Sequence, residues 1–212
     1  MPNLKDLKIN RFIFIDSDVK NVTLHGYSDA SKDAYGAAIY LRCVTSSNEI
    51  KVSLLCSKSR VAPIKVLTVP RLELCAAELL SKLTSTVLSS LNLEISKVYL
   101  YTDSTIVLAW IDSSPHLLKV FVSNRISRIQ ELTKNCCWKW ISSNTNPADL
   151  ISRGVSPDQL ATNSLWWNGP PDLYELEITQ SNSELVPLSD EDYLQEFKKL
   201  PCETTLTVAV EN

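Results

Sequence analysis

The 212-residue chain has no long apolar run, no cysteine pair at metal-binding spacing and only two histidines. No apolar run approaches the roughly 18 residues that a bilayer-spanning helix needs. The N-terminus, residues 1–6, lacks the apolar segment of a secretory signal peptide. These absences predict an intracellular protein of the cytoplasm or nucleus, neither secreted nor bound to a membrane.

Six cysteines are present, but none form a C-x-x-C motif. With so few histidines, this spacing argues against a zinc site. Cys43, Cys56 and Cys75 lie in apolar strand or helix patterns, so we expect them to be buried as small hydrophobic side chains. A reducing compartment fits this pattern better than a disulfide framework.

The net charge of −3 conceals a strong asymmetry. Residues 1–171 hold 19 basic and 14 acidic residues, whereas residues 172–212 hold 2 basic and 10 acidic ones. A net charge of +5 on the body is too weak by itself to argue for nucleic-acid binding. The acidic segment is poor in aromatic residues, so the sequence predicts a mobile tail.

Hydrophobic periodicity predicts alternating strands and helices. Two strands, 23–27 and 35–41, are joined by a short polar turn and indicate a hairpin. The further predicted elements are a strand at 51–57, a helix at 70–91, a strand at 97–102, helices at 104–110 and 116–134, a strand at 137–141 and a short helix at 147–154. The order predicts an α/β fold, a mixed sheet with helices packed on its faces.

Four acidic residues occupy suggestive positions. Asp29 ends the first strand, Asp103 lies at a strand-to-helix junction, and Glu73 and Asp149 fall in the first turns of predicted helices. Three of them have a structural explanation: Asp29 as a turn residue, Asp103 as an N-cap, and Glu73 as a favourable charge at a helix start. If the four meet, they need cations, and hard oxygen ligands suit Mg²⁺ or Mn²⁺. Two such ions about 4 Å apart are a known device for phosphoryl displacement.

A series of short motifs in this order resembles a ribonuclease H domain, most closely the version carried by BEL/Pao retrotransposons. The resemblance covers residues 24–171, and the order and spacing of the motifs carry it. The motifs are Ser28-Asp29-Ala30-Ser31, Ser57-Lys58-Ser59-Arg60-Val61-Ala62-Pro63, Thr68-Val69-Pro70-Arg71-Leu72-Glu73-Leu74-Cys75-Ala76-Ala77, Tyr101-Thr102-Asp103-Ser104, Asn146-Pro147-Ala148-Asp149-Leu150-Ile151-Ser152-Arg153-Gly154 and Leu165-Trp166-Trp167-Asn168-Gly169-Pro170.

The resemblance implies a ribonuclease H-like fold with a five-stranded mixed sheet whose first three strands are antiparallel. It implies cleavage of the RNA strand of RNA–DNA hybrids, with two Mg²⁺ ions or Mn²⁺ in their place. The reverse transcriptase and integrase of a parent polyprotein would be its partners. The implied catalytic and metal-binding residues are Asp29, Glu73, Asp103 and Asp149.

Residues 51–71 hold five basic residues and no acidic one. They could form a solvated loop or a rim that contacts phosphates, since Lys and Arg neutralise a nucleic-acid backbone without reading its sequence. A strand glycine such as Gly36 can mark a close approach by a ligand. The predicted nucleic-acid-binding residues are Ser31, Gly36, Lys58, Arg60, Lys65, Arg71, Ser104 and Arg153.

Two departures from the family pattern leave alternatives open. Many relatives have a histidine shortly before the fourth acid, and residues 142–145 contain none. The polymerase, protease and integrase of such a polyprotein are also absent, so a catalytically silent relic or a domesticated binding module remains the alternative. An aspartic protease is suggested only by Asp103-Ser104-Thr105, which lacks the glycine that such enzymes need.

The sequence divides into four parts. We expect a linker remnant at 1–22, the ribonuclease H-like domain at 23–155, a Trp-rich extension at 156–171 packed on or near that domain, and the acidic tail at 172–212.

Overall fold

A five-stranded mixed sheet forms the centre of the protein. The computed structural model describes residues 18–176 and 191–198; the predicted linker at 1–22 and the acidic tail lie largely outside these ranges. The strands are β1 (Val19–Ala30), β2 (Ala34–Thr45), β3 (Ile50–Val61), β4 (Lys97–Thr102) and β5 (Cys136–Trp140), in the spatial order β3-β2-β1-β4-β5.

The pairing directions match the expected fold. β1, β2 and β3 pair antiparallel, whereas β4 pairs parallel with both β1 and β5. β1 therefore has an antiparallel neighbour on one side and a parallel one on the other. The predicted α/β class, with a mixed sheet and three antiparallel strands first, is confirmed.

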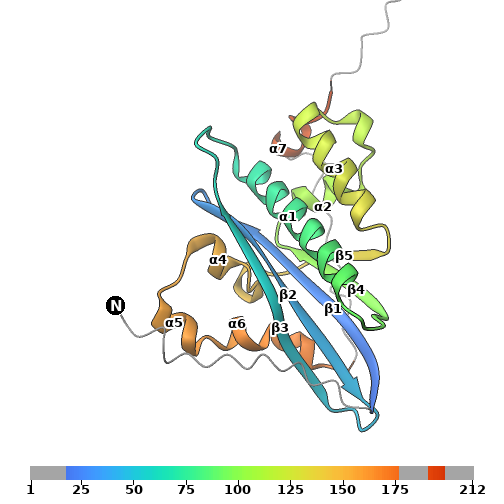
Figure 1. The fold of residues 1–212 in the computed structure, drawn as a ribbon. Coiled ribbons are helices and arrows are strands. Elements are labelled where there is room, and N and C mark those ends of the chain that lie inside the picture. The colour runs from blue at the N-terminus through green and yellow to red at the C-terminus, as the bar shows by residue number, and fades with distance from the viewer. Residues whose placement is uncertain (1–17, 177–190, 199–212) are drawn as a thin grey trace, which may run out of the picture.

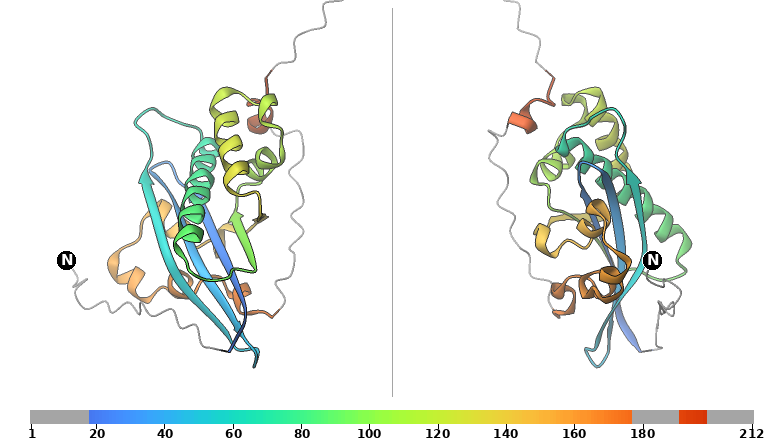
Figure 2. Two further views of the ribbon diagram at one scale, coloured as in Figure 1. Left: turned by 45° about the vertical axis from the view of Figure 1, so that its right-hand side comes forward. Right: turned by 90° about the vertical axis from the view of Figure 1, so that its left-hand side faces the viewer.

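Helices cover both faces of this sheet (Figure 1). One face carries α1 (Val69–Ser90), with α2 (Thr105–Asp112), the 3₁₀ helix η2 (Pro115–Leu117) and α3 (Val120–Leu132) beside it. The opposite face carries α4 (Asp149–Arg153), α5 (Pro157–Thr162) and α6 (Ser164–Asn168), as the turned views show (Figure 2). Two further 3₁₀ helices are η3 (Ser143–Thr145) and η4 (Pro171–Tyr174), and α7 (Glu191–Leu194) follows later in the chain.

The α1 face of the sheet is aliphatic. Side chains alternate along a strand, so every second residue points to the same face. Leu24, Ile39 and Leu41 pack there with Leu80 of α1 and Leu100 of β4, all at most 1% exposed. The helix periodicity of 70–91 and the alternation of the strands predict this interior directly.

The α4 face of the sheet is aromatic and partly polar. Tyr27 stacks on Tyr101 with ring centroids 4.9 Å apart, and Tyr40 meets Tyr27 edge-on. His25 and Arg42 are also buried here, at 0% and 4% exposure. This side of the protein therefore depends on hydrogen bonds as well as on apolar packing.

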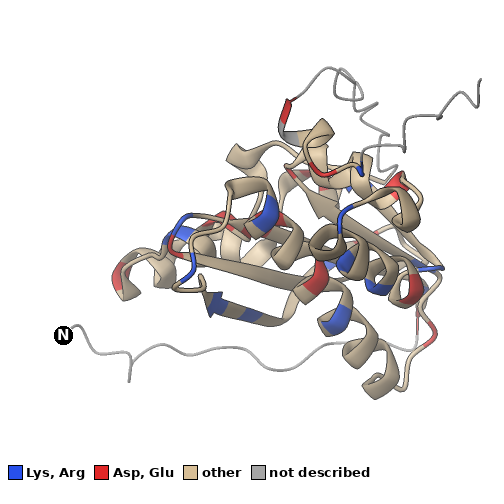
Figure 3. Cartoon of the chain, turned by 90° about the horizontal axis from the view of Figure 1, so that it is seen from above, with Lys and Arg blue, Asp and Glu red and all other residues tan. Residues whose placement is uncertain are grey.

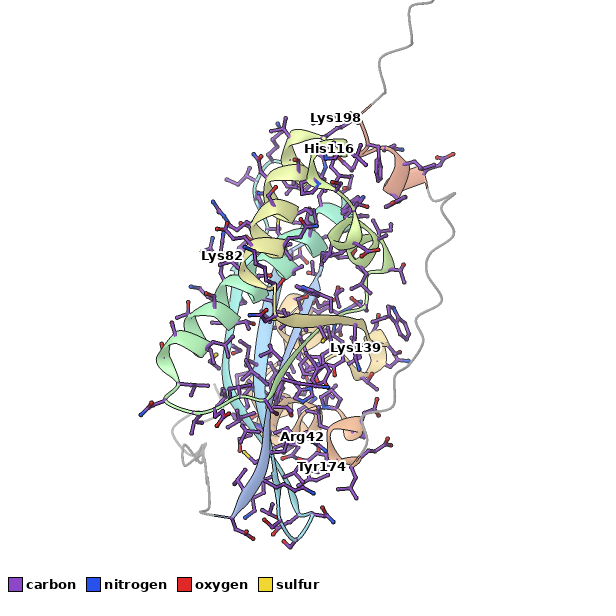
Figure 4. All side chains as sticks on the ribbon, turned by 90° about the vertical axis from the view of Figure 1, so that its right-hand side faces the viewer. Arg42, Lys82, His116, Lys139, Tyr174 and Lys198 are labelled. Atoms are coloured by element: carbon purple, nitrogen blue, oxygen red, sulfur yellow. The ribbon has the colours of Figure 1, made fainter. Side chains whose placement is uncertain are left out.

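The Trp-rich extension supplies the partners for those polar groups. The Tyr40 hydroxyl donates to the Trp166 carbonyl at 2.7 Å, and the Arg42 guanidinium donates to the Leu173 and Glu175 carbonyls, both at 2.6 Å. Arg42 lies close to Tyr174 in the side view (Figure 4). The extension thus completes the core on this face of the sheet.

Three local predictions need correction. β3 continues to Val61, so Lys58 and Arg60 lie on an edge strand that pairs with β2 and not in a loop. The helix predicted for 116–134 is η2 followed by α3, because Leu118 and Lys119 adopt extended backbone. α5 was not predicted, although a capping box between Ser156 and Gln159 marks its start.

Two described parts of the acidic segment are packed against the body. Leu173 is 2% exposed and Tyr193 of α7 is 9% exposed. Glu196 accepts two hydrogen bonds from the Arg71 guanidinium, at 2.7 and 3.1 Å, and Leu118 forms an isolated antiparallel bridge with Phe197. Composition predicted mobility for these residues and could not reveal contacts with α1, with α2 and with Leu118 before α3.

The described helices are short or polar enough that none qualifies as a membrane span.

Candidate active site

Two aspartates lie at the same edge of the sheet. β1 and β4 are parallel neighbours, and Ser28 pairs with Thr102 in their register. Asp29 and Asp103 each follow by one residue, so both stand at the carboxyl end of a strand. Such strand ends are where binding sites form in α/β sheets.

Asp29 is 5% exposed and lies on the α4 side of β1, where the buried hydroxyl of Ser152 donates to its Oδ2. Burial raises the pKa of Asp29 to about 7, and the negative charges of Asp103 and Asp149 add to this rise. A residue that simply started a turn would stay solvated and acidic. The charges of Asp103 and Asp149 therefore act on the buried carboxylate of Asp29.

Asp103 is held by polar neighbours but keeps one oxygen free. Ser143 of η3 donates to its Oδ2 at 2.5 Å, and Trp140 donates to its carbonyl at 3.1 Å. Its Oδ1 is buried without a hydrogen-bond partner among the described residues. The N-cap of α2 is Ser104, which accepts from the Val107 amide, so Asp103 does not serve as the cap.

Glu73 approaches the same edge from α1. The helix begins at Val69, so Glu73 lies beyond the first turn, and the expected helix-dipole explanation does not hold. Burial raises its pKa, a hydrogen bond from Ser104 lowers it, and the charge of Asp103 raises it further. Glu73 is therefore an electrostatic neighbour of Asp103.

Asp149 opens α4, as the sequence predicted. Its Oδ1 accepts from Arg153 Nε at 2.5 Å, one turn along the helix, and α4 ends at Gly154 with φ of +80°. Ser31 anchors this helix by donating to the Ser152 carbonyl at 2.6 Å. A pocket of about 430 Å³ opens beside Asp149, lined also by Ser143 and Arg153.

Within residues 18–176 and 191–198, no three acidic, histidine or cysteine side chains converge closely enough to hold a metal ion in the observed arrangement. The carboxylates instead contact the hydroxyls of Ser152 and Ser143 and the guanidinium of Arg153. The four predicted acids thus gather at one edge, each with a local polar partner.

The predicted nucleic-acid-binding residues divide into two groups. Lys58, Arg60 and Lys65 are exposed on β3 and the loop that follows it. Gly36 is buried, and a Cβ there would lie 2.5 Å from Ile151 Cδ1, so its close neighbour is α4. Arg71 is paired with Glu196 and lies over the Phe121 ring.

Ser31, Ser104 and Arg153 lie around the predicted acids, where they anchor α4, bond to Glu73 and pair with Asp149 respectively.

Sequence reasoning missed Ser143 and Ser152. Ser152 lies three residues after Asp149, on the turn of α4 that faces β1, and this spacing was a usable signal. Ser143 lies in the segment where a histidine was sought, and no pattern in the sequence indicates its contact with Asp103.

Comparison with known proteins gives one family. Residues 1–104 match the family model described as "Pao retrotransposon-like RNaseH-like domain". This stretch contains β1 to β4, α1 and three of the four acids. No curated protein matches the chain.

Several solved ribonuclease H structures are similar at low identity. The N-terminal RNase H domain of a Mycobacterium tuberculosis protein, solved as a fusion with maltose binding protein, is 12% identical, with 63% of this chain and 91% of that chain covered and a TM-score of 0.39. An RNase H1 from the halophilic archaeon Halobacterium salinarum is 14% identical over 62% of this chain and 93% of its own, with a TM-score of 0.37. The RNase H domain of the prototype foamy virus is 14% identical over 65% and 92%, with a TM-score of 0.36.

The match over residues 1–104 agrees with the order of the motifs, with the strand order and with the position of the acids at the ends of β1 and β4. Residues 1–104 of this chain therefore resemble the Pao retrotransposon-like RNaseH-like domain family.

Proposed function

We propose that the protein is a metal-dependent endonuclease of ribonuclease H type, from a retrotransposon polyprotein, that cleaves the RNA strand of RNA–DNA hybrids. One observation carries the proposal: burial raises the pKa of Asp29, and the negative charges of Asp103 and Asp149 raise it further, at the edge where two parallel strands end. Structural ion pairs bring opposite charges together, whereas a gathering of like charges is typical of a cation site.

The donor set fits Mg²⁺, with Mn²⁺ as the alternative ion. Among the residues that the structure describes, Asp103 Oδ1 is buried without a hydrogen-bond partner, an arrangement that costs about 1–3 kcal/mol unless a ligand satisfies it. Asp29, Glu73, Asp103 and Asp149 would hold the metal, and we expect two ions. When bound, the metal would supply an activated water and stabilise charge on the leaving oxygen.

The remaining residues of the site orient these carboxylates. Ser152 bonds to Asp29 from the same helix that carries Asp149, so it links two of the acids. Ser143 fixes Asp103 Oδ2 and thereby turns Oδ1 inward. Arg153 places a positive charge at the exposed rim beside Asp149, where it can meet a substrate phosphate.

The substrate would reach this edge past exposed basic residues. Lys58, Arg60 and Lys65 lie on β3 and its following loop, next to the start of α1. Contacts of this kind position a duplex through its phosphates and carry no sequence information. In a polyprotein, reverse transcriptase and integrase parts would be the natural partners.

The test is cleavage of a labelled RNA–DNA hybrid in Mg²⁺ or Mn²⁺ by the whole chain and by Asp103→Asn. We expect the variant to lose activity by about 100-fold or more, since even indirect partners of a metal cost 10- to 100-fold. Asp112→Asn, an exposed aspartate at the end of α2, is the matched control and should cleave normally. Cleavage that persists in Asp103→Asn refutes the assigned site.

A second candidate is a binding module with the same fold and no catalysis. The observation that favours it is that no three described acidic side chains form a closed cluster. Hybrid binding by a folded wild-type chain that shows no cleavage in either metal would select this alternative.

A further inference from the structure

A basic pocket lies on the outer surface of α1, apart from the carboxylates. It has a volume of about 270 Å³ and is bounded by α1, α3 and the paired ends of β2 and β3. Glu78 and Lys82 come from α1, Arg125 and Arg128 from α3, and Arg60 from β3. Viewed from above, basic and acidic residues are both distributed over the helices of the protein (Figure 3).

The pocket holds more positive charge than its one carboxylate can balance. Glu78 contacts Lys82 Nζ at 2.6 Å, Arg128 NH1 at 3.2 Å and Arg125 Nε at 3.4 Å. Arg60 lines the same space and adds a fourth cation. Four cations around one anion leave a local excess of three positive charges, which an incoming anion would relieve.

Arg125 is already oriented toward this space. Its guanidinium lies 3.7 Å from the centre of the Phe121 ring, and its NH1 donates to the Phe121 carbonyl at 3.0 Å. Its Nε is buried and has no hydrogen-bond partner among the described residues, because Glu78 lies within ion-pair distance but not in hydrogen-bond geometry. A donor held in place without an acceptor favours binding of an oxyanion.

The chemistry of the pocket matches a phosphate group. Guanidinium forks fit phosphate oxygens in pairs, and both arginines come from one face of α3, three residues apart. Glu78 lies five residues after Glu73, about 7.5 Å along the helix axis and on a different face of α1. The pocket therefore lies outside the carboxylate edge but on the same helix.

We propose that this pocket binds a backbone phosphate of a nucleic-acid strand beyond the point of cleavage. The assignment of nucleic acid as the source of the phosphate rests on the proposed function. The contact would be independent of sequence and would anchor the duplex across the outer surface of α1.

The experiment measures binding of a fluorescent RNA–DNA hybrid to the full chain by anisotropy in EDTA, so that cleavage plays no part. The variants are Arg128→Glu, whose side chain is 58% exposed, and the double change Arg125→Ala/Arg128→Ala. The control is Lys20→Ala/Lys97→Ala, which removes the same charge from exposed positions at the far end of the sheet. Thermal unfolding of each variant verifies the fold.

We expect the double change to raise the dissociation constant of the hybrid about 10-fold and to reduce the slope of log K against log salt by about 1 to 2. The lysine control should change neither quantity by more than about twofold. Equal changes in hybrid affinity for the two double variants would overturn the proposal that this pocket binds a backbone phosphate.

Inorganic phosphate, titrated as a second probe, separates the two sources of phosphate. Loss of phosphate binding in Arg128→Glu with unchanged hybrid affinity would assign the pocket to a free anion and overturn the nucleic-acid proposal. Hybrid binding that depends on the pocket in a chain that never cleaves would sink the proposed catalysis and leave this inference standing.

Discussion

The two faces of the sheet are built from different chemistry. Under α1, aliphatic side chains such as Leu24 and Leu80 fill the interior without polar groups. On the α4 side, the interior contains a neutral histidine, stacked tyrosines and a buried arginine. Packing on the first face requires only apolar side chains of suitable volume at the right sequence period. The buried polar side chains of the second face require hydrogen-bond partners more than a hundred positions away in the sequence. Asp29 and the helix that carries Asp149 belong to the second face, so the site shares its dependence on distant contacts.

Truncation should separate the faces most clearly. Leu80 is fully buried, and Leu80→Ala should lower the free energy of unfolding by about 3–5 kcal/mol. Tyr40→Phe on the other face removes only the hydroxyl that reaches the Trp166 carbonyl and should cost about 1 kcal/mol. Urea unfolding checks both values, and a larger loss in Tyr40→Phe would contradict the contrast.

Acid should weaken the α4 face first. Burial, then the charges of Arg42 and Lys139, lower the pKa of His25 from 6.5 to about 3. The unfolded chain therefore takes up a proton below about pH 6.5 that the folded chain refuses, so stability falls as the pH drops from 6.5 toward 3, by at most about 4 kcal/mol.

His25→Gln should flatten this part of the profile of unfolding free energy against pH. The exposed His116 provides the matched control, because His116→Gln leaves the buried face unchanged. An unaltered slope in His25→Gln would show that other groups cause the acid sensitivity.

The buried arginine should couple the sheet to the extension. Arg42→Leu removes both hydrogen bonds to residues 173 and 175 and should cost about 2–3 kcal/mol, the range for bonds to charged groups. Limited proteolysis should then cut within 163–176 faster than in Lys32→Leu, a change in the exposed β1–β2 turn. Equal cutting in both variants would mean that Arg42 does not hold the extension.

Two glycines allow the two faces to be compared at single positions. Gly26 lies under side chains of the α1 face, and Gly36 lies under a side chain of the α4 face. A Cβ at Gly26 would meet Leu80 at 2.7 Å and Leu100 at 2.9 Å, whereas one at Gly36 would meet Ile151 at 2.5 Å. Gly26→Ala should cost about 2–3 kcal/mol because its neighbours are locked in the core. Gly36→Ala should cost about 1 kcal/mol, because the short helix α4 can shift.

The shift of α4 should appear in metal binding. Gly36→Ala should weaken Mn²⁺ binding measured by titration, and the added change Ile151→Ala should restore it. Stronger loss of metal binding in Gly26→Ala would reverse the expected roles of the two faces.

The elements of the α1 face could be predicted from sequence because their signals are local. The apolar period of 70–91 lies within one residue of α1 at each end, and the predicted strand 97–102 coincides with β4. The hydrogen bonds of the α4 face could not be predicted from sequence, because no pattern near Arg42 or Tyr40 indicates which backbone carbonyls their side chains bond to. The pairing of Arg71 with Glu196 could not be predicted for the same reason.

The site shows the same division. The sequence alone determined which carboxylates are present, the family that their motifs resemble and the sheet that carries them. Only the tertiary structure decided that Ser152 and Ser143 hold two of these acids, that Gly36 accommodates α4, and that Arg71 turns to the C-terminal segment. Local patterns encode strands and helices because their hydrogen bonds are local, whereas a charge takes its partner from whichever segment the completed fold places beside it.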